Sequence, residues 1–238
     1  MAEPTHIYGN IFDSHCQTLV NAVNCNGVMG RGIALEFKFR FPDLFENYNL
    51  ICKKKLLEPG LLYLWKGSGK WVLNFPTKNN WRLPSKLDYI ESGLENFARN
   101  YKQYNISSIA FSILGSGAGG LDENLVIELM GKYFEPLENI EIEIYHFNPR
   151  ANDEFFNRIY NKIKRFNVDD YILQLDINAT QAQNLIDAIN SNEIKLMIDF
   201  QKIKGMGEKT IKKLYDFHND GLEKVETNPT SQLGITFR

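Results

Sequence analysis

Three loops in the first half of the chain carry residues that suit a phosphate-containing ligand. The first, N-C-N-G-V-M-G-R-G (residues 24–32), follows an apolar run and precedes a stretch of helical period. Gly27, Gly30 and Gly32 let the backbone approach a ligand, and amides at the start of the next helix favour an anion such as a pyrophosphate. Asn24 and Asn26 add side-chain amides that suit ribose hydroxyls. The alternative for this loop is a flexible turn with Asx caps.

The second loop, G-S-G-A-G-G (residues 115–120), follows the apolar run at 108–114. It fits the spacing G-x-G-x-x-G through Gly115, Gly117 and Gly120. A dinucleotide-binding fold places this motif in its first strand–helix–strand unit, with an acidic residue ending the next strand, whereas here the motif lies late and the next strand ends in His146. We therefore predict a backbone cradle for phosphate rather than a nicotinamide site. A tight strand-to-helix turn is the alternative.

The third loop, N-F-P-T-K-N-N-W-R (residues 74–82), contains Lys78, which we consider the candidate catalytic lysine. Because a proline ends regular strand pairing, we expect Thr77 and Lys78 to lie on a loop rather than in a strand or on a helix face. A lysine among apolar groups or near Arg82 has a lowered pKa and can act as a nucleophile or proton donor. Most lysines are solvated surface groups; Lys78 is singled out by the two other ligand-type loops and by an aromatic residue and a cation, Trp81 and Arg82, three and four residues later.

A layered α/β framework is needed to position these loops, and the alternation of elements between residues 5 and 146 predicts one. Runs rich in β-branched and aromatic residues predict strands at 18–24, 61–65, 71–75, 108–114 and 140–146. Apolar spacing predicts helices at 32–41, 86–101 and 123–133, the second with Ser85 as N-cap. All three loops follow strand ends, where open α/β sheets bind ligands.

Four blocks of sequence occur in an order that resembles the macrodomain family. They are V-N-A-V-N-C-N-G-V-M-G-R-G-I-A-L-E-F-K (20–38), N-F-P-T-K-N-N-W-R (74–82), S-K-L-D-Y-I-E-S-G-L (85–94) and G-S-G-A-G-G-L-D (115–122). Within the family the chain resembles the DarG-type antitoxin macrodomains, relatives of the human terminal ADP-ribose protein glycohydrolase. The resemblance implies a three-layer α/β/α sandwich with a mixed central sheet that binds ADP-ribose. It also implies removal of ADP-ribose from DNA bases, which reverses a DNA ADP-ribosyltransferase toxin, without a cofactor.

The resemblance assigns roles to individual residues. Lys78 matches the lysine needed for removal of ADP-ribose, and Asn24 matches the asparagine that faces the distal ribose, so both are expected catalytic residues. The human relative has an aspartate in the second glycine loop where this chain has Gly119, with the nearest carboxylate at Asp122, which argues against a lysine–aspartate mechanism. Ser116 stands where many relatives have cysteine. The expected ligand-binding residues are Asn10, Ile11, Asn26, Val28, Met29, Gly30, Gly32, Ile33, Thr77, Gly115, Ser116, Gly117, Ala118, Gly119, Gly120 and Leu121.

The expected reaction breaks the glycosidic bond at the anomeric carbon of the distal ribose, through a transition state with oxocarbenium character. Lys78 either assists the departing base as a cation or acid, or attacks the sugar to form a transient adduct; the sequence leaves both routes open. No metal is required. The histidines His6, His15, His146 and His218 are scattered and suggest no metal site.

After His146 the sequence contains a proline and polar residues and has no regular apolar spacing, which predicts a domain boundary near Pro149. We expect a macrodomain at 1–150 and a small all-α domain at 151–238. We expect helices at 155–166, 180–190 and 211–217, and a mobile tail over the last dozen residues. Residues 200–215, F-Q-K-I-K-G-M-G-E-K-T-I-K-K-L-Y, resemble a helix-hairpin-helix motif (expected near 199–217), which binds the DNA backbone. A capped helix with a solvated lysine face is the alternative. The expected nucleic-acid contacts are Lys204, Gly205, Gly207, Lys209 and Thr210, together with Trp81 and Arg82 in the first domain.

Composition limits the other function classes. The chain has 27 Lys and Arg and 29 Asp and Glu, so its positive and negative charges nearly balance. This excludes a positive electrostatic potential over the whole protein that would attract nucleic acid or an anionic membrane. Short apolar runs, no signal sequence and three cysteines without C-x-x-C spacing predict a cytoplasmic protein with reduced thiols and no membrane partner. The expected partners are ADP-ribose and ADP-ribosylated single-stranded DNA, while binding of a cognate toxin stays open. The alternatives are a non-catalytic ADP-ribose reader and a hydrolase that acts on ADP-ribosylated protein or ADP-ribose-1''-phosphate.

Overall fold

A computed structural model describes residues 3–217 and 235–237 of the chain. The described residues form two units, divided between Asn148 and Pro149, and each unit is considered by itself. Residues 235–237, which the sequence places in a mobile tail, instead form a strand of the first unit. The rest of the predicted tail and His218 lie outside the described residues.

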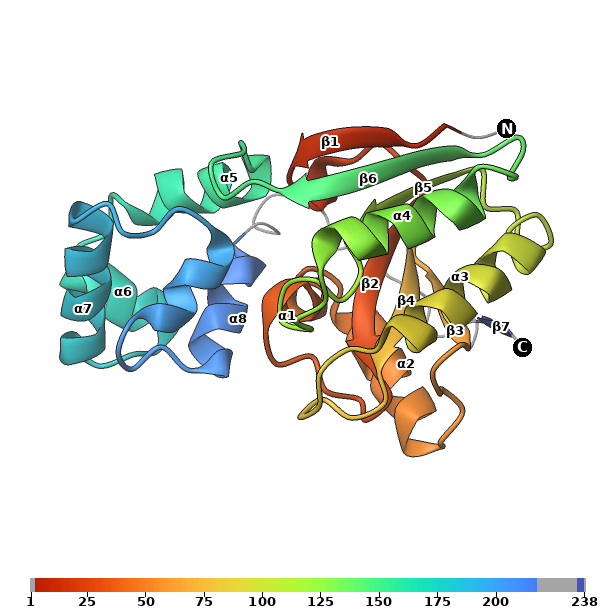
Figure 1. The fold of residues 1–238 in the computed structure, drawn as a ribbon. Coiled ribbons are helices and arrows are strands. Elements are labelled where there is room, and N and C mark those ends of the chain that lie inside the picture. The colour runs from red at the N-terminus through yellow and green to blue at the C-terminus, as the bar shows by residue number, and fades with distance from the viewer. Residues whose placement is uncertain (1–2, 218–234, 238) are drawn as a thin grey trace. The chain divides into compact units, whose positions relative to one another are not determined.

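The first unit is built on a seven-stranded mixed sheet in the order β1-β6-β5-β2-β4-β3-β7 (Figure 1). Neighbouring strands from β1 to β4 are parallel, and the last two pairings, β4 with β3 and β3 with β7, are antiparallel. The strands are β1 (Thr5–Gly9), β2 (Thr18–Asn24), β3 (Leu62–Lys66), β4 (Trp71–Lys78), β5 (Ser108–Ser112), β6 (Glu141–Phe147) and β7 (Ile235–Phe237). This arrangement confirms the predicted α/β fold with a mixed central sheet.

Helices cover both faces of the sheet, because successive strand residues point into two separate cores. Along β2, Leu19 packs with Phe37 of one helix pair, whereas the next residue, Val20, packs with Phe97 of the other. The first pair is α1 (Gly32–Arg40) and α2 (Pro42–Lys53), and the second is α3 (Leu87–Asn100) and α4 (Glu123–Phe134); a short 3-10 helix, η1, spans Ile11–Asp13. The result is the predicted three-layer sandwich.

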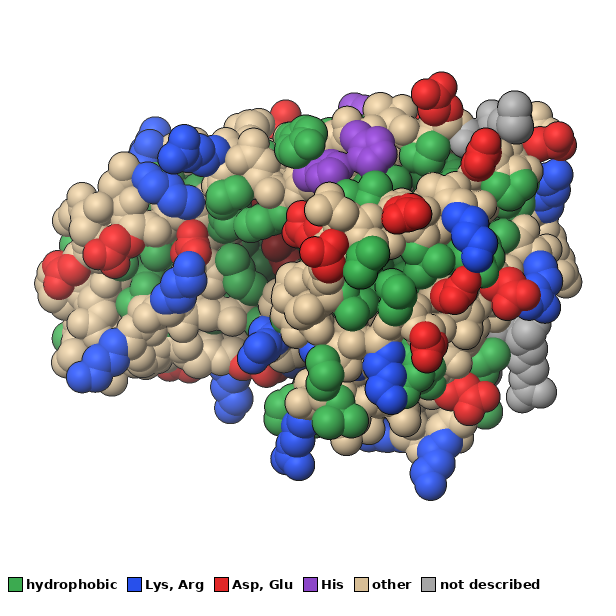
Figure 2. Space-filling view, in the orientation of Figure 1, with side chains coloured by type: hydrophobic (Ala, Val, Ile, Leu, Met, Phe, Trp, Pro, Cys, Tyr) green, Lys and Arg blue, Asp and Glu red, His purple; other side chains and the backbone are tan. Residues whose placement is uncertain are grey.

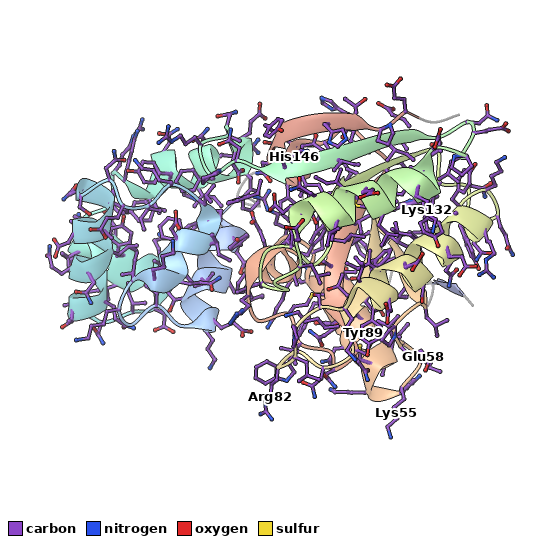
Figure 3. The ribbon with its side chains drawn as sticks, in the orientation of Figure 1. Lys55, Glu58, Arg82, Tyr89, Lys132 and His146 are labelled. Carbon is purple, nitrogen blue, oxygen red and sulfur yellow. The ribbon has the colours of Figure 1, made fainter. Side chains whose placement is uncertain are left out.

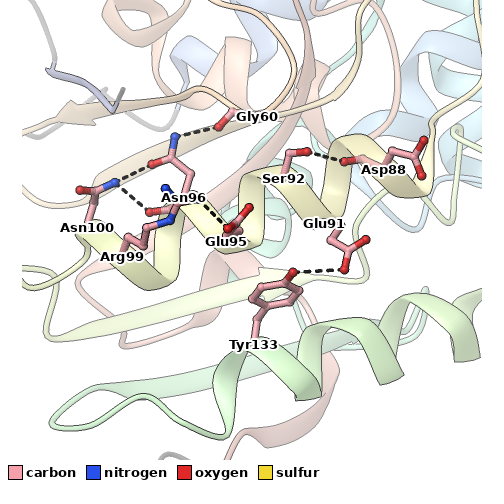
Figure 4. Close-up of polar contacts among 9 residues, drawn as sticks. All are labelled: Gly60, Asp88, Glu91, Ser92, Glu95, Asn96, Arg99, Asn100 and Tyr133. Atoms are coloured by element: carbon pink, nitrogen blue, oxygen red, sulfur yellow. Dashed lines mark hydrogen bonds and ion pairs between the residues drawn. The ribbon is translucent and has the colours of Figure 1, made fainter.

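Polar contacts anchor α3 at several points along its length (Figure 4). Asn96 donates its side-chain amide to the carbonyl oxygen of Gly60 at 2.8 Å, which ties α3 to the chain before β3. On the neighbouring helix α4, the Tyr133 hydroxyl donates to Glu91 at 3.1 Å. Both contacts hold α3 over the sheet and so fix where the loop before it lies.

Strand β4 is longer than predicted, and the expected loop position of Thr77 and Lys78 is wrong. The strand continues through Pro76 to Lys78. It can do so because the register between β2 and β4 shifts after Val23, which pairs with Pro76, while Asn24 pairs with Lys78. A proline has no amide hydrogen for the ladder and is tolerated in a strand at such an irregularity.

The prediction of Ser85 as the N-cap of α3 is also wrong. The N-cap is Lys86, and the helix begins at Leu87. Ser85 is buried and donates its amide to the carbonyl oxygen of Gly119 at 3.0 Å. Its hydroxyl donates to Oγ1 of Thr77 at 3.3 Å. Ser85 therefore joins the end of β4 to the second glycine loop instead of capping a helix.

Four elements of the first unit were not predicted: β1, η1, α2 and β7. Strand β1 is an edge strand with mostly exposed side chains, so it carries no apolar run. Helix α2 begins at Pro42, which in the sequence marks the end of the preceding helix. Proline is also favoured at the first position of a helix, where no amide hydrogen is needed.

The second unit is helical. The expected helices at 155–166, 180–190 and 211–217 correspond to α5, α7 and α8, whereas α6 and the 3-10 helix η2 were not predicted. Helix α6 begins at a capping box formed by Asn167 and Asp170. Among the described residues, no helix of either unit is long and apolar enough to cross a bilayer. The elements are α5 (Glu154–Ile163), α6 (Val168–Leu175), α7 (Ala179–Asn190), η2 (Met197–Lys202) and α8 (Glu208–Asp216).

Candidate active site

Two adjoining cavities form one cleft in the first unit, at the carboxyl ends of the parallel strands. The larger has a volume of about 650 Å³ and the smaller of about 330 Å³. All three predicted loops reach this cleft, as expected for an open α/β sheet. The residues that line both cavities are Ala22, Arg31, Ala34, Thr77, Lys78, Gly117, Ala118 and Gly119.

The side chain of Asn24 holds the first loop in shape. It is buried in the wall of the larger cavity, and its Nδ2 donates to the carbonyl oxygen of Val28 at 2.6 Å. Its Oδ1 accepts the amide of Asn26 at 2.9 Å, and the Tyr48 hydroxyl donates to its main-chain oxygen at 2.6 Å. The Asx turn considered as an alternative for this loop is therefore present, within a loop that also lines a cavity.

The start of helix α1 offers free donors to the cleft. Arg31 is the N-cap and makes no side-chain hydrogen bond to the helix. The amides of Gly32 and Ile33 have no intrahelical acceptor, as is usual at a helix start, and both residues line the smaller cavity. Such a helix start favours an anion.

The second glycine loop is a tight turn that exposes backbone amides. Gly115 and Gly120 have positive φ angles of 70° and 79°, and the turn is closed by the Leu121 amide, which donates to the Gly115 carbonyl oxygen at 3.1 Å. Within the described chain, the amides of residues 117–119 have no hydrogen-bond acceptor. These residues line both cavities, so the loop presents unpaired donors beside the cleft.

Packing excludes a side chain at Gly119. A Cβ at this position would overlap with the carbonyl oxygen of Gly115 and with the Ser85 hydroxyl. An aspartate therefore does not fit here. Asp122, the nearest carboxylate in the sequence, caps α4 by accepting the Leu125 amide at 3.1 Å and lines neither cavity. The carboxylate that does line the smaller cavity is Glu123, which the sequence analysis missed.

Lys78 lies at the end of β4, in the wall that the two cavities share. Its Nζ donates to the carbonyl oxygen of Ala118 at 2.8 Å. Partial burial lowers the pKa of its ammonium group, and the charge of Arg31 lowers it further. Arg31, Lys78 and Arg82 line the larger cavity, and none of its described lining residues is acidic. The larger cavity is thus cationic and contains one amine with a lowered pKa.

The third loop brings Trp81 and Arg82 to the larger cavity, in agreement with their expected proximity to Lys78. Figure 3 shows Arg82 projecting outward from this loop. On the face shown in Figure 2, a few Lys and Arg side chains lie together at the upper left, and over the rest of the face Lys and Arg alternate with Asp and Glu. The cationic character of the cavity is therefore local. In the described ranges, no group of three or more His, Cys, Asp or Glu side chains is placed to hold a metal ion.

Most of the predicted ligand-binding residues line the cleft, and four do not. Asn10 caps η1 by accepting the Phe12 amide at 3.1 Å, and Met29 is buried in a hydrophobic core. Asn26 accepts the Trp81 amide at 3.1 Å, and Leu121 packs on the other core. The predicted residues that line the cleft are Ile11, Asn24, Val28, Gly30, Gly32, Ile33, Thr77, Lys78, Gly115, Ser116, Gly117, Ala118, Gly119 and Gly120.

The sequence analysis missed several other cleft residues. Arg31 lies within the first glycine loop, which the resemblance places beside the pyrophosphate and distal ribose, but it was not among the expected site residues; it lines both cavities. Tyr145 and Phe147 line the smaller cavity at the end of β6. Phe147 is 75% exposed. Aromatic residues at the end of the last predicted strand were the signal that could have identified them.

Comparisons with known proteins agree with this geometry. Residues 20–130 match the Macro domain family. A DNA ADP-ribosyl glycohydrolase of Mycobacterium tuberculosis is 40% identical over 145 residues, which are 59% of this chain and 41% of that relative. The chain thus spans about two fifths of the length of the curated relatives it matches.

Solved structures show the same likeness. The macrodomain of Mycobacterium tuberculosis DarG superposes with a TM-score of 0.59 at 40% identity, covering 61% of this chain and 98% of that one. Thermosipho africanus DarTG, solved in complex with ADP-ribose, superposes with a TM-score of 0.58 at 39% identity, covering 62% of this chain and 42% of that one.

Proposed function

Because this chain belongs to the macrodomain family, we propose that it is a hydrolase that removes ADP-ribose from ADP-ribosylated DNA bases and so reverses a DNA ADP-ribosyltransferase toxin. The observation that carries the proposal is the position of Lys78. Its amine lies in the wall between two cavities, beside a helix start and a glycine loop that both offer unpaired amides. A relative named for this activity, the DNA ADP-ribosyl glycohydrolase of Mycobacterium tuberculosis, supports it.

Each part of the ligand has a complementary part of the cleft. The pyrophosphate receives hydrogen bonds from the start of α1 and from the second glycine loop. The adenosine occupies the smaller cavity, where Ile11, Tyr145 and Phe147 supply apolar and aromatic surface. The distal ribose and its attached base then lie in the larger, cationic cavity. In this arrangement Asn24 is a positioning residue, since its own polar atoms are occupied in holding the first loop.

Two routes are open to Lys78, and both end in ADP-ribose and the free base. In the first, its ammonium donates a proton to the departing base while water adds to the anomeric carbon, and the proton lost by that water restores the ammonium. In the second, the neutral amine displaces the base from the anomeric carbon and the proton released from the amine passes to the departing base; water then hydrolyses the bond between nitrogen and carbon and restores the neutral amine. The lowered pKa of Lys78 increases the fraction of neutral amine at a given pH. The Ala118 carbonyl oxygen accepts a hydrogen bond from either form of the side chain.

The test is incubation with a single-stranded oligonucleotide that carries ADP-ribose on thymidine or guanosine, followed by mass measurement. We expect loss of the ADP-ribose mass with the parent protein and a fall in rate of at least about 100-fold for Lys78→Ala. Lys132→Ala is the matched control, because Lys132 pairs with Glu91 on the protein surface and lines neither cavity. An equal rate for Lys78→Ala contradicts the proposal.

Parallel incubations separate the alternative functions. Binding of free ADP-ribose without release from any linkage identifies a reader. Release only from modified acidic side chains or from ADP-ribose-1''-phosphate identifies a different substrate class. A cytoplasmic location and a cognate toxin partner stay predictions from the sequence.

The second unit supplies a DNA-backbone contact in this proposal. Gly205, with a φ angle of 89°, and Gly207 connect η2 to α8. The carbonyl oxygens of Lys204 and Gly205 accept from Asn184 at 3.1 Å and from Gln181 at 2.5 Å. Because these acceptors are occupied, the hairpin offers mainly donors to a phosphate, at the N-terminus of α8.

Side chains around the hairpin differ in what they can contribute. Lys204 and Lys209 are exposed and, within the described chain, form no ion pair. Thr210 is buried, so only its backbone remains for the contact expected from the sequence. The two lysines therefore carry the charge in this proposal.

A further inference from the structure

We propose that Glu123 binds the ribose of the adenosine half of the ligand, so that the cleft accepts ADP-ribose with a free 2'-hydroxyl on that ribose and rejects the form phosphorylated there. The inference rests on the proposed function, which places the adenosine in the smaller cavity. It adds a specificity-determining residue to that function and narrows its substrate class.

Glu123 departs from the charge pattern of the rest of the cleft. The two cations of the smaller cavity, Arg31 and Lys78, also line the larger cavity, so they lie where the two cavities meet. Among the described residues that line the smaller cavity alone, Glu123 is the one with a charged side chain. The part of the smaller cavity away from Lys78 is therefore acidic, whereas the remainder of the cleft is cationic.

The backbone around Glu123 fixes its place at the cavity. The Leu121 amide closes the glycine turn on the Gly115 carbonyl oxygen at 3.1 Å, and Asp122 caps α4, so the chain enters the helix directly at Glu123. Glu123 is exposed, and in the described part of the chain no hydrogen bond or ion pair engages its carboxylate. Both carboxylate oxygens are therefore available to a ligand.

A carboxylate near a bound pyrophosphate is unfavourable unless it also meets hydrogen-bond donors of the ligand, because like charges repel at short range. The adenosine half of ADP-ribose carries two kinds of donor, the hydroxyls of its ribose and the exocyclic amine of its ring. In the proposed function the glycine loop binds the pyrophosphate, to which this ribose is directly bonded, while Tyr145 and Phe147 of β6 supply aromatic surface for the ring. Glu123 closely follows the glycine loop in the chain, so its carboxylate faces the ribose rather than the ring.

A phosphate on the 2'-oxygen of this ribose meets the wrong charge. Two neighbouring hydroxyls can both donate to the two oxygens of one carboxylate. A 2'-phosphate removes one of these donors and adds negative charge beside a group that only accepts. In dinucleotide sites a carboxylate that binds the ribose hydroxyls suits the unphosphorylated form, whereas an arginine accommodates the 2'-phosphate. The same rule applied to Glu123 predicts a cleft for ADP-ribose derived from an unphosphorylated nicotinamide dinucleotide.

Calorimetric titration with free ligands tests the inference, with ADP-ribose and its adenosine 2'-phosphorylated form as probes. We expect the parent protein to bind ADP-ribose at least about 10-fold more tightly. Glu123→Ala should reduce this preference, and Glu123→Lys should abolish or reverse it, because an ammonium group pairs with the added phosphate.

Glu128→Lys is the matched control for Glu123→Lys. It makes the same change in net charge on the same helix, and Glu128 is exposed and lines neither cavity. Because salt screens a charge that is distant from the ligand, its preference should stay within about twofold of that of the parent protein.

Two further analogues identify the group that Glu123 contacts. ADP-ribose that lacks the adenosine 2'-hydroxyl should bind the parent protein about 3- to 10-fold more weakly than ADP-ribose does, and this difference should largely vanish in Glu123→Ala. An analogue with hypoxanthine in place of adenine lacks the exocyclic amine, and its affinity relative to ADP-ribose should be the same in both proteins. If loss of the amine instead weakens binding only in the parent protein, Glu123 contacts the ring and the inference is wrong.

A purely structural role for Glu123 has a different signature. A carboxylate in the first turn of a helix stabilises that helix through its dipole. Loss of this role lowers the stability of Glu123→Ala in urea unfolding but leaves the preference between the two ligands unchanged. An unchanged preference in Glu123→Ala and Glu123→Lys, or an equal change in Glu128→Lys, therefore overturns the inference.

The outcomes also separate this inference from the proposed function. A parent protein that binds ADP-ribose and the 2'-phosphorylated form equally rejects the selectivity alone. A parent protein that binds neither ligand contradicts the proposed function itself.

Discussion

The amine of Lys78 and the carbonyl oxygen of Ala118 are joined by a 2.8 Å hydrogen bond that links the end of β4 to the second glycine loop. The same loop offers the unpaired amides at residues 117–119. A phosphate that binds these amides therefore settles on the segment that also orients the lysine. Ligand binding and placement of the reactive amine are thus coupled through one short loop.

The pH dependence of turnover should reveal which form of Lys78 reacts. Arg31 lowers the pKa of Lys78, so Arg31→Gln should raise that pKa toward its ordinary value. If the neutral amine attacks, kcat rises with pH through this pKa; if the ammonium donates a proton, kcat falls through it. In either case the limb of the kcat–pH profile that is governed by the pKa of Lys78 moves to higher pH in Arg31→Gln.

A pH profile of kcat for the parent protein and Arg31→Gln checks this prediction. Arg82→Gln is the control, because Arg82 lines the same cavity but does not shift the pKa of Lys78. If this limb of the profile stays in place in Arg31→Gln, or moves equally in Arg82→Gln, the pH dependence of kcat is not set by the pKa of Lys78.

The second glycine loop should not tolerate even a methyl group at residue 119. In Gly119→Ala the Cβ meets the Gly115 carbonyl oxygen and Ser85, so we expect a loss of about 1–3 kcal/mol in the unfolding free energy of the first unit. Affinity for ADP-ribose should fall as well, since the loop must shift.

Urea unfolding and calorimetric titration measure the two effects of Gly119→Ala. Gly117→Ala provides the comparison, because a Cβ at residue 117 meets nothing within 4 Å. Similar stability in the two variants would mean that the loop relaxes without cost.

The role of Asn24 can be separated from direct ligand contact by Asn24→Asp. A carboxylate cannot donate to the Val28 carbonyl oxygen, which leaves a partly buried acceptor without its partner, at a cost of about 1–3 kcal/mol. We expect a lower unfolding free energy even without ligand, together with weaker ADP-ribose binding.

Asn26→Asp is the matched variant for Asn24→Asp. Asn26 is exposed, and its side chain accepts a hydrogen bond from the Trp81 amide, which an aspartate side chain can also accept. Thermal or urea unfolding of both apo proteins tests the difference. If Asn24→Asp has the stability of the parent protein without ligand and only ligand binding is lost, Asn24 contacts the ligand directly instead of holding the loop.

Reversing the charge of the hairpin lysines should weaken binding to unmodified single-stranded DNA. In Lys204→Glu/Lys209→Glu two cationic contacts are lost, and the slope of log K against log salt should become shallower by about 1.4. Titrations at several salt concentrations measure this slope. Lys195→Glu, also exposed in the second unit but outside the hairpin, should change it little. An unaltered slope in the double variant argues for a solvated lysine face.

Periodicity and glycine spacing predicted the layered fold and the meeting of three loops, because both depend on local sequence. The exact end of β4 depended on a register shift opposite Val23, which belongs to another strand and leaves no mark near Pro76. Ser85 has the chemistry of an N-cap, and only the packed structure shows that its hydroxyl points to Thr77 instead. Arg31 gained its role from its closeness to Lys78, which no sequence pattern encodes.

Across the sheet, Asn24 and Lys78 are partners in the register of β2 and β4. The reactive amine is therefore fixed by the ladder of a central strand and not by the conformation of a mobile segment. A one-residue insertion or deletion within β4 upstream of Pro76 would carry Lys78 to the opposite face of the sheet, because side chains alternate along a strand. The number of residues between Trp71 and Lys78 therefore fixes the face of the sheet on which Lys78 lies. Substitutions keep this number, whereas an insertion or deletion changes it.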